Sequence, residues 1–443
     1  MTRLSVVGLG KLGTCTATCF AYRGFPVLGM DSDPGVVDAV NAGRAPVQEP
    51  GLDELIAGVR GRLRATTDYG TLVDESDVTF LIVPTPSEEG GRFSDRYLRL
   101  ALMPLAGALR EHRKPYHLFV VTSTVSPGTT DGTLIPLIER GSGRLVGEGF
   151  GVCYGPEFIA LGSVIRDFLQ PDLVLIGESD ERAGETLAEI YRATHENSPY
   201  VARMSIISAE ITKLSLNAYV TMKISFANTL ASICASVPGA DVDAITSALG
   251  ADHRISPWGL KGGLPYGGPC FPRDNRAFAA FAGHHGVGAD LALATDTVNR
   301  DQTRRLVDLV IDAYKTHHAA RAAVLGLAYK PNTPVTDESA AVAVVNALLD
   351  AGAAVTVYDP LAAPAARRHF GDRVGIATSA RQAMAESPFT VITLPLPEFA
   401  AIDDSYIISN PAVIVDCWRV LAPARFRKAV TYVALGRHHD GAA

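Results

Sequence analysis

The sequence has little that would favour a nucleic acid as a partner. Its 40 Lys and Arg residues are outnumbered by 47 Asp and Glu residues, which gives a formal net charge of −7. A protein with this balance lacks the extended basic surface that binding along a phosphate backbone requires. A local positive site for a small anion remains compatible with an acidic protein. We therefore expect a small-molecule ligand and no nucleic acid.

Long apolar runs are also missing. No stretch of about 18 apolar residues occurs, so the sequence predicts no transmembrane helix and no membrane partner. The opening residues lack the layout of a secretory signal peptide, because their short apolar run passes directly into a glycine turn. Together with the scattered cysteines described next, which are typical of a reduced protein, these features lead us to expect a cytoplasmic protein.

Cysteines are few and scattered. None of the six forms a C-x-x-C pair, and their spacing suits neither a disulfide framework nor a structural zinc site. We expect no metal, and most of the thiols should be buried as small apolar side chains. The six residues are Cys15, Cys19, Cys153, Cys234, Cys270 and Cys417.

What is present points to an α/β protein. With 443 residues, of which 47% are apolar, the chain suffices for about three domains of ordinary size. Its first half alternates apolar runs with helical stretches, which predicts a parallel sheet covered by helices on both faces. The strands expected there are residues 4–7, 26–30, 78–83, 118–122, 151–154 and 173–176.

The middle of the chain has a helical pattern, and the end returns to alternation. Residues 205–236 contain no Pro or Gly, which favours one long helix. Further helices are expected at residues 241–249, 276–285 and 289–314, with a loop rich in Gly and Pro at residues 259–274. Strands are then expected at residues 322–327, 354–358, 390–394 and 413–415, with a helix at residues 339–351.

A coarse internal repeat defines the expected architecture. A strand, a glycine turn, a helix and a second strand ending in Asp open the chain at residues 6–31 and recur at residues 324–359. The repeat predicts two Rossmann-like doubly wound domains joined by a long central helix and a helical connector. The expected boundaries are 1–200 for a dinucleotide-binding domain, 201–315 for a central helical domain and 316–443 for a second Rossmann-like domain. Residues 436–443 are expected to form a frayed tail.

The first glycine turn has the pattern G-x-G-x-x-G. Its residues are Gly8, Leu9, Gly10, Lys11, Leu12 and Gly13. Asp31 ends the next strand, 21 residues after Gly10, where an acid reaches the ribose 2′-hydroxyl of a dinucleotide. The glycines let the backbone approach a pyrophosphate at a helix N-terminus. A glycine turn in a cofactor-free domain is the alternative, but strand, helix and acid together favour NAD. NADP is disfavoured, because a carboxylate repels a 2′-phosphate.

Cys270 lies in a stretch whose sequence is GGPCFPRD, at residues 267–274. The glycines and prolines suit a loop whose backbone approaches a ligand closely. A cysteine followed four residues later by Asp274 suits a nucleophile with a carboxylate that orients water. A buried structural cysteine is the alternative, and composition alone favours it.

Four further polar residues are candidates for chemistry. Lys213 and Asn217 are four residues apart in the long helix and therefore share one face, from which both can donate to an oxyanion. The alternative is a solvated lysine and an asparagine between helices. Glu157 and Thr124 follow predicted strands, at the sheet edge where ligands bind in open α/β folds. They suit a base and a holder of water, or else an exposed loop acid and a capping threonine.

Together these segments resemble the UDP-glucose/GDP-mannose dehydrogenase family, the nucleotide-sugar 6-dehydrogenases, and are closest in motif to its UDP-glucose branch. The resemblance runs nearly end to end, and the combination of GGPCFPRD with LGLAYKPNT is highly specific. It reverses the preference for a structural Cys270. The segments that carry it are GLGKLG (8–13), VPTP (83–86), STV (123–125), PEF (156–158), SAEITKLSLNAYVTMKISFAN (208–228), HRI (253–255), GGPCFPRD (267–274) and LGLAYKPNT (325–333).

The resemblance implies an NAD-dependent, four-electron oxidation of a nucleotide-sugar C6 alcohol to a uronic acid, with UDP-glucose as the first expected substrate. Cys270 would add to the aldehyde, and the thiohemiacetal would be oxidised to a thioester that water hydrolyses. The remaining implied catalytic residues are Lys213 and Asn217 for the oxyanions, Glu157 as base, and Thr124 and Asp274 as holders of water.

The resemblance also implies the binding contacts and an assembly. Arg254 would reach the sugar site of a neighbouring subunit, which implies at least a homodimer formed by residues 201–315. Residues 316–443 would bind the nucleotide sugar. Implied cofactor contacts beyond the glycine turn and Asp31 are Thr85, Thr124 and Lys330. Implied substrate contacts are Glu157, Phe158, Lys213, Asn217, Arg254, Gly267, Gly268, Phe271 and Lys330.

Three positions depart from the pattern common in the family. Leu161, Leu173 and Asp337 each remove or invert a charge near an expected ligand region. They leave two alternatives open: the same reaction on GDP-mannose, a UDP-N-acetylhexosamine or dTDP-glucose, or a catalytically impaired homologue that binds a nucleotide sugar. A single-step β-hydroxyacid dehydrogenase would share the first domain and the Lys/Asn helix, but would lack the cysteine loop and the second Rossmann-like domain.

Overall fold

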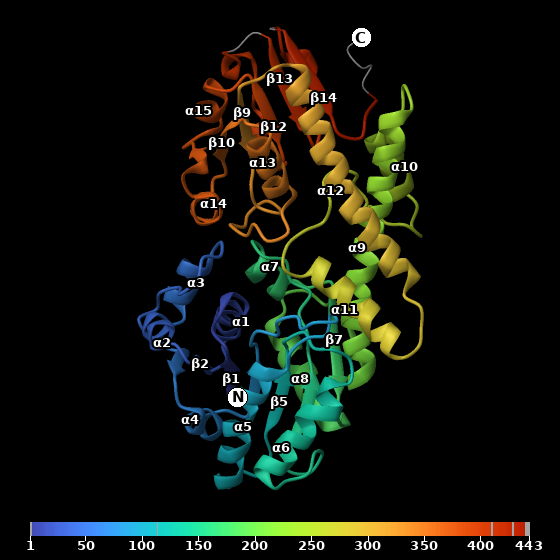
Figure 1. Cartoon of the computed structure of the whole chain (residues 1–443). Helices are drawn as coiled ribbons and strands as arrows, with labels where there is room; N and C mark the ends of the chain where they lie inside the picture. Colours follow the sequence, from blue (N-terminus) through green and yellow to red (C-terminus); the bar gives the residue numbers. More distant parts are fainter. Residues whose placement is uncertain (1, 113, 409–410, 428, 439–443) are drawn as a thin grey trace. The chain divides into compact units, whose positions relative to one another are not determined.

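The computed structural model describes residues 2–112, 114–408, 411–427 and 429–438 (Figure 1). Its contacts divide the chain into two compact units, Met1–Ser215 and Leu216–Ala443. Most of the tail predicted at residues 436–443 lies outside the described residues, which end at residue 438.

Among its described residues, the first unit contains an eight-stranded sheet. The strand order is β3-β2-β1-β4-β5-β6-β7-β8, and every neighbouring pair is parallel except β6–β7. The expected parallel sheet therefore needs one correction, because β7 reverses direction where two strands are appended to the six-stranded Rossmann order. The strands are β1 (Leu4–Val7), β2 (Val27–Met30), β3 (Leu63–Thr66), β4 (Val78–Leu81), β5 (Leu118–Val121), β6 (Gly151–Tyr154), β7 (Leu173–Glu178) and β8 (Tyr200–Ser205).

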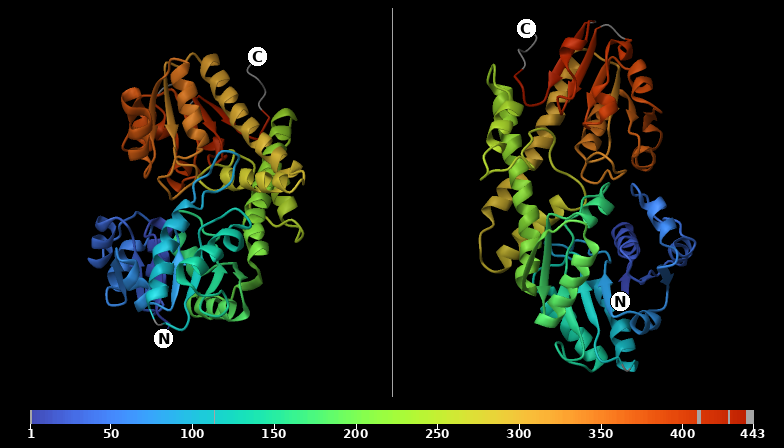
Figure 2. Two further views of the ribbon diagram at one scale, coloured as in Figure 1. Left: turned by 60° about the horizontal axis from the view of Figure 1, so that its bottom comes forward. Right: turned by 180° about the vertical axis from the view of Figure 1, so that it is seen from behind.

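Helices cover both faces of this sheet. Successive residues of β5 alternate between two apolar clusters, Leu118 and Val120 in one and Phe119 and Val121 in the other, because strand side chains point alternately to opposite faces. Helices α5 and α6 lie side by side in Figures 1 and 2. The helices are α1 (Lys11–Tyr22), α2 (Pro34–Asn41), α3 (Leu52–Gly58), α4 (Tyr69–Glu75), α5 (Arg96–Glu111), η1 (Thr130–Leu134), α6 (Ile135–Ser142), α7 (Val164–Leu169) and α8 (Glu181–Thr194).

The described part of the second unit contains a six-stranded, fully parallel sheet. Its order, β11-β10-β9-β12-β13-β14, repeats the order of the first six strands of the chain. This is the strand order of the Rossmann fold, so the predicted pair of Rossmann-like domains is confirmed. The strands are β9 (Arg321–Leu325), β10 (Ala354–Tyr358), β11 (Val374–Ile376), β12 (Phe389–Ile392), β13 (Ala412–Asp416) and β14 (Val430–Ala434).

The long central helix is also confirmed, as α9 (Ile206–Ser236), which spans the boundary between the two units. Within the second unit α9 lies beside α12, seen in Figure 2 as green and yellow helices. The Ser225 hydroxyl donates to the Thr295 carbonyl at 3.3 Å, and Arg305 donates to the Ser232 hydroxyl at 2.8 Å. The other helices are α10 (Val242–Gly250), α11 (Phe271–His284), α12 (Asp290–Thr316), α13 (Ala340–Asp350), α14 (Ala363–Phe370), η2 (Gly371–Arg373), α15 (Ala380–Ala385), α16 (Pro397–Ala400), η3 (Asp404–Tyr406) and η4 (Pro423–Arg425).

The start of α11 corrects the sequence prediction. The loop was expected to continue through Asp274, but the helix begins at Phe271. Pro272 occupies its first turn, where the missing N–H of proline costs no helical hydrogen bond. Cys270 is therefore the N-cap residue, and the Asp274 N–H donates to the Cys270 carbonyl at 2.8 Å.

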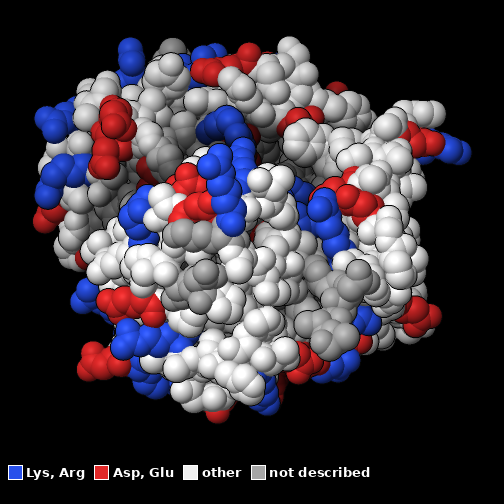
Figure 3. Space-filling model, turned by 90° about the horizontal axis from the view of Figure 1, so that it is seen from above, with Lys and Arg blue, Asp and Glu red and all other residues white. Residues whose placement is uncertain are grey.

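The surface agrees with the charge balance of the sequence. On the face drawn in Figure 3, acidic and basic side chains are interspersed. None of the described helices has the length and apolar character that crossing a membrane demands.

Candidate active site

The three glycines of the first turn have three different environments. Gly8 has φ +91°, and a Cβ there would collide with the Ile82 carbonyl. A Cβ on Gly13 would collide with the Gly8 carbonyl. At Gly10, by contrast, a Cβ would find no atom of the described residues within 4 Å. Gly8 and Gly13 therefore shape the turn, whereas Gly10 leaves open space in front of the N-terminus of α1.

The carboxylate of Asp31 faces this turn. Its Oδ2 accepts the Leu9 N–H at 2.8 Å, and its Oδ1 accepts the Asp33 N–H at 3.0 Å. The side chain is only partly buried, so each oxygen keeps capacity for a second donor. Open space at Gly10 for a pyrophosphate and a carboxylate for ribose hydroxyls match the requirements of NAD.

Two other predicted cofactor residues follow β4 and β5. Val83 is tied to Ser123, because its N–H donates to the Ser123 hydroxyl at 2.9 Å and its carbonyl accepts from that hydroxyl at 2.7 Å. Thr85 and Thr124 are each within two residues of this link, at the carboxyl edge of the sheet. Lys11 and Leu12 open α1, and the Leu12 side chain packs into an apolar cluster, so its backbone N–H is the group that remains for a ligand.

The first unit brings Lys213 to the loop that carries Glu157. The Lys213 ammonium donates to the Glu157 carbonyl at 2.6 Å and lies 4.5 Å from the centre of the Phe158 ring. Removal of the Glu157 carboxyl from water raises its pKa to about 7, and the positive charge of Lys213 only partly offsets this effect. A carboxyl that titrates near neutral pH is suited to exchange protons in catalysis.

Two buried carboxylates that the sequence analysis missed hold the neighbouring loops. Glu49 accepts the N–H groups of Gly162 and Val164 at 3.2 and 3.0 Å. Glu210, one turn before Lys213 on α9, accepts the N–H groups of Gly128 and Thr130 at 2.6 and 3.0 Å. Neither carboxylate lies in a pattern that distinguishes it from a surface acid, so only the fold reveals these contacts.

The second unit brings together Asn217, Asp274 and Cys270. The Asn217 amide donates to the Asp274 carboxylate at 2.6 Å, and the Arg273 guanidinium donates to its other oxygen at 3.1 Å. Asp274 and Asn217 are almost fully buried, whereas Cys270 is exposed at the N-terminus of α11. The partial positive charge of a helix N-terminus favours an anionic group such as a thiolate.

The other cysteines behave as predicted. All five are buried, which leaves Cys270 as the accessible thiol among the six. Burial raises the pKa of the Cys15 thiol to about 12, so this thiol is kept protonated and unreactive. The reading of Cys270 as a buried structural cysteine is therefore wrong.

The glycines before Cys270 contact protein more closely than the sequence suggests. A Cβ on Gly267 would collide with the Glu338 carbonyl. Gly268 has φ +82°, lies against the Tyr329 ring and donates its N–H to the Asp337 carbonyl at 2.9 Å. Both glycines thus allow the loop to pack against the 329–338 segment.

The other predicted binding residues lie in different places within the second unit. Phe271 stacks edge-to-face with Tyr266, their ring centres 6.3 Å apart. The Lys330 ammonium is 5.9 Å from the Tyr329 ring centre. Arg254 is exposed, and its guanidinium makes two hydrogen bonds to Asp252, at 2.9 and 2.6 Å.

The three departures from the family pattern receive different explanations. Leu161 packs against a cluster formed by Cys15, Leu52 and Val164, where an apolar residue fits. Asp337 is exposed, and its backbone carbonyl holds Gly268. Leu173 opens β7, and nothing in the structure explains the choice of that residue.

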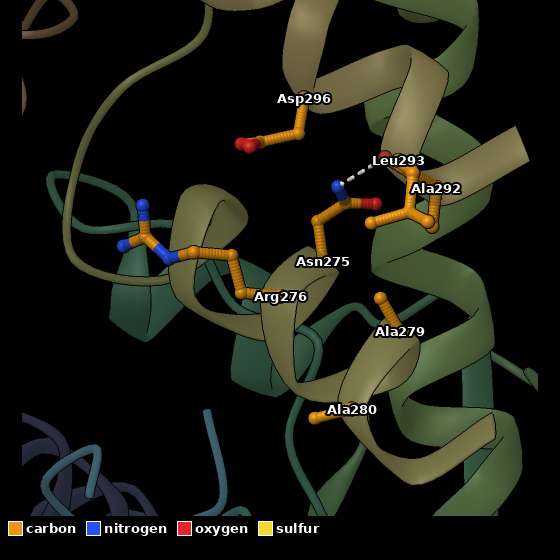
Figure 4. Close-up of a pocket in the computed structure, with 7 residues that line it drawn as sticks. All are labelled: Asn275, Arg276, Ala279, Ala280, Ala292, Leu293 and Asp296. Atoms are coloured by element: carbon orange, nitrogen blue, oxygen red, sulfur yellow. Dashed lines mark hydrogen bonds between the residues drawn. The ribbon is translucent and has the colours of Figure 1, made fainter. Parts of the chain in front are cut away.

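A pocket of about 300 Å³ lies between α11 and α12 (Figure 4). There the Asn275 amide donates to the Ala292 carbonyl at 2.9 Å and so ties the two helices together. None of the predicted site residues lines it; the lining residues are Asn275, Arg276, Ala279, Ala280, Ala292, Leu293 and Asp296.

The fold and the first turn define a dinucleotide-binding dehydrogenase of the Rossmann type. The chain belongs to the UDP-glucose/GDP-mannose dehydrogenase family, whose NAD binding, central and UDP binding domains match residues 2–195, 207–301 and 323–423. The predicted family is thereby confirmed, and the protein is an NAD-dependent nucleotide-sugar 6-dehydrogenase. The single-step β-hydroxyacid dehydrogenase is excluded.

Named relatives support the same assignment. UDP-glucose 6-dehydrogenase AglM of Haloferax volcanii is 40% identical, covering 94% of this chain and 97% of its own. GDP-mannose 6-dehydrogenase of Pseudomonas aeruginosa is 34% identical, with 81% of each chain covered. A solved UDP-glucose dehydrogenase from Pyrobaculum islandicum superposes with a TM-score of 0.89 at 33% identity, over 99% of this chain and 98% of that one.

Proposed function

We propose that this protein oxidises the C6 alcohol of UDP-glucose to the carboxylate of UDP-glucuronate through a covalent adduct on Cys270. The observation that carries the proposal is the exposed thiol at the N-cap of α11, four residues before Asp274, whose carboxylate accepts a hydrogen bond from Asn217. UDP-glucose is the first choice of substrate, because the relatives from Haloferax volcanii and Rhizobium meliloti, at 40 and 36% identity, are UDP-glucose 6-dehydrogenases.

The adduct explains how a single enzyme completes two oxidations without releasing an aldehyde. NAD⁺, when bound, accepts one hydride in each oxidation. After the first, the Cys270 thiolate adds to the aldehyde carbon and the new oxyanion takes up a proton, which gives a thiohemiacetal. Loss of a hydride and that proton then gives a thioester. Water attacks the thioester, the carbon–sulfur bond breaks, and the carboxylate and the thiol are released.

The surrounding polar groups supply charge and proton transfer in this proposal. Lys213 and Asn217 donate to the oxyanions of the adduct. Glu157 accepts the proton of the attacking water, which Thr124 and Asp274 orient. Because the pKa of Glu157 is raised to about 7, its basic form predominates only above that pH. Hydrolysis should therefore rise with pH through neutrality.

Substrate contacts and assembly complete the proposal. Phe158, Gly267, Gly268, Phe271 and Lys330 are assigned to the nucleotide sugar in the same chain, with Thr85 and Lys330 also near the cofactor. Arg254 is assigned to the sugar site of a second copy. We place the enzyme in the cytoplasm, because its reduced thiols suit that compartment.

An apolar stripe on α9 supports a homodimer. Tyr219, Phe226 and Ile233 recur at seven-residue spacing, so they share one face of the helix, and they are 58, 53 and 52% exposed. Trp258, which follows Arg254 by four residues, is 83% exposed. Such exposed aromatic residues are typical of an interface between subunits. Light scattering should report a dimer, and Phe226→Ser should shift it toward monomer.

The decisive experiment gives purified protein NAD⁺ and one nucleotide sugar at a time, and measures NADH by absorbance and products by mass. UDP-glucose should yield two NADH per sugar and UDP-glucuronate. Cys270→Ser should lower acid formation by at least about 1000-fold, the scale on which enzymes lose activity with their nucleophile. Iodoacetamide should alkylate wild type at Cys270 and should leave Cys270→Ser unmodified. The buried Cys15 is the internal control and should stay unmodified in both proteins.

The same panel tests the alternatives. GDP-mannose, UDP-N-acetylhexosamines and dTDP-glucose are included, because a GDP-mannose 6-dehydrogenase is 34% identical to this chain. Preference for one of them would replace UDP-glucose in the proposal but keep the reaction. Tight binding of a sugar nucleotide with no NADH formed would identify an impaired homologue and contradict the proposal.

A further inference from the structure

The loop that carries Glu157 is held from a distant part of the first unit. Glu49 is buried, with 6% of its surface exposed, and precedes α3. Its two carboxylate oxygens accept the N–H groups of Gly162 at 3.2 Å and Val164 at 3.0 Å. More than 100 residues separate donor and acceptor in sequence, so this contact fixes the 155–163 loop against the rest of the unit.

A carboxylate suits this position for two reasons. The first N–H groups of a helix have no partner within it, and Val164 is the first residue of α7. A negative charge at a helix N-terminus is also electrostatically favourable. Apolar packing reinforces the link, since Ile159 and Leu161 of the loop lie against the cluster that contains Leu52, three residues after Glu49.

The held loop in turn sets the surroundings of Glu157. The backbone carbonyl of Glu157 accepts a hydrogen bond from the Lys213 ammonium at 2.6 Å. Three titratable groups interact electrostatically with the Glu157 carboxyl, and they come from three elements: Lys213 on α9, Tyr191 on α8 and Cys19 on α1. Any displacement of the loop therefore changes both the position of the Lys213 ammonium and the access of water to the carboxyl.

We propose that Glu49 is a positioning residue for the hydrolytic step, holding the 155–163 loop so that Glu157 stays shielded from water and Lys213 stays on its carbonyl. This inference rests on the proposed function, in which Glu157 is the base that activates water. Glu49 itself touches neither substrate nor cofactor. It acts through the backbone of Gly162 and Val164.

The test compares Glu49→Gln with Glu54→Gln, an exposed glutamate on α3 that serves as the matched control. In Glu49→Gln one oxygen remains, while the new NH2 group faces an N–H and repels it. The turnover number for acid formation should fall at least about tenfold, because small misplacements of catalytic groups are costly. The KM for NAD⁺ should stay unchanged, as should every parameter of Glu54→Gln.

The pH profile separates positioning from general damage. If Glu157 is the base, the acid limb of the wild-type turnover number should lie near the raised pKa of Glu157, about 7. A loosened loop admits water, which lowers that pKa toward its ordinary value, so the acid limb of Glu49→Gln should move to lower pH. An unmoved limb together with a lower thermal midpoint would show a merely structural role and overturn the proposal.

Hydrogen exchange tests the positioning without any turnover. Amides of residues 155–164 should exchange at least about tenfold faster in Glu49→Gln than in wild type, while those of the α1 turn stay unchanged. Unchanged exchange in the loop would overturn the inference even if the enzyme is active. If wild type forms no acid from any sugar nucleotide, the proposed function fails. Faster exchange in Glu49→Gln would then show only that Glu49 holds the loop, with no part in hydrolysis.

Discussion

The same backbone turn follows β1 in the first unit and β9 in the second, but the two turns use their aspartates differently. Gly8 and Gly326 have φ of +91° and +99°, and each donates its N–H to the last residue of the neighbouring strand. Asp31 then accepts two backbone N–H groups and stays partly exposed. Asp359 is only 4% exposed and accepts four, from Leu327, Ala328, Leu361 and Ala362.

The residues after the first glycine explain the difference. In the first unit Gly10 leaves open space, and α1 begins at once with Lys11. In the second unit Ala328 takes the corresponding place, and the next helix, α13, begins only at Ala340. An open turn at a helix N-terminus suits a dinucleotide. In the second turn the aspartate already accepts four backbone N–H groups of its own chain, so it lacks the free capacity that Asp31 keeps for ribose hydroxyls.

The largest effect on stability is expected from removing the Asp359 carboxylate from the turn after β9. Asp359→Ala leaves four backbone N–H groups of the turn without their acceptor, which should destabilise the second unit by at least about 3 kcal/mol. Both tryptophans, Trp258 and Trp418, lie in that unit, so their fluorescence during urea unfolding reports its stability alone. Affinity for NAD⁺ at low urea should be retained. A midpoint equal to that of wild type would contradict the closed role of Asp359.

The next effect distinguishes two glycines of the open turn. Gly13→Ala pushes a Cβ into the Gly8 carbonyl and should destabilise the first unit by about 2 kcal/mol, because backbone cannot yield as a flexible side chain does. Gly10→Ala finds free space and an ordinary φ of −67°, so it should leave stability unchanged while weakening NAD⁺ binding. Thermal unfolding with and without NAD⁺ separates the two outcomes. Equal effects of both substitutions on stability would refute the distinction.

The open aspartate should affect the cofactor rather than the fold. Asp31→Asn removes the charge that we assign to the ribose hydroxyls of NAD⁺. A hydrogen bond to a charged group contributes about 1.5–3 kcal/mol, so the KM for NAD⁺ should rise about tenfold to hundredfold. The preference for NAD⁺ over NADP⁺ should fall, because the repulsion of a 2′-phosphate is lost. Steady-state kinetics with both cofactors measures this. Asp33→Asn, at the exposed cap of α2, is the control and should change neither constant.

Features that depend on neighbouring residues could be predicted from the sequence. GLGKLG followed by Asp31 predicts the cofactor turn, and the 205–236 segment predicts α9, because turn and helix depend on neighbouring residues. The start of α11 was misplaced by five residues, since the helix-starting role of Pro272 competed with the loop signal of the glycines before it.

Contacts between distant segments could not be predicted in this way. Glu49 and Glu210 look like surface acids in sequence, and only the packed fold brings them to backbone N–H groups 80 or more residues away. The burial of Asp359 and its four backbone N–H partners could not be predicted either. The sequence repeat gives Asp31 and Asp359 the same position after a strand and does not distinguish them. The sequence pattern therefore predicts the two Rossmann-like folds, whereas the burial of each aspartate determines whether it is free to accept a ligand.

The smallest effect is expected where the two units are alike. Gly24 ends α1 and Gly352 ends α13 with the same C-terminal motif: the N–H of each glycine donates three residues back, and the following N–H donates five residues back, to Phe20 and Leu348. Their φ values are +103° and +84°, and a Cβ at either would contact no atom of the described residues within 4 Å. Gly24→Ala and Gly352→Ala should therefore each cost about 1 kcal/mol through backbone strain alone. Urea unfolding can be monitored by NAD⁺ binding for the first unit and by tryptophan fluorescence for the second. The two substitutions should lower the free energy of unfolding by equal amounts. A clear inequality would show that the two units differ in more than the turn after their first strand.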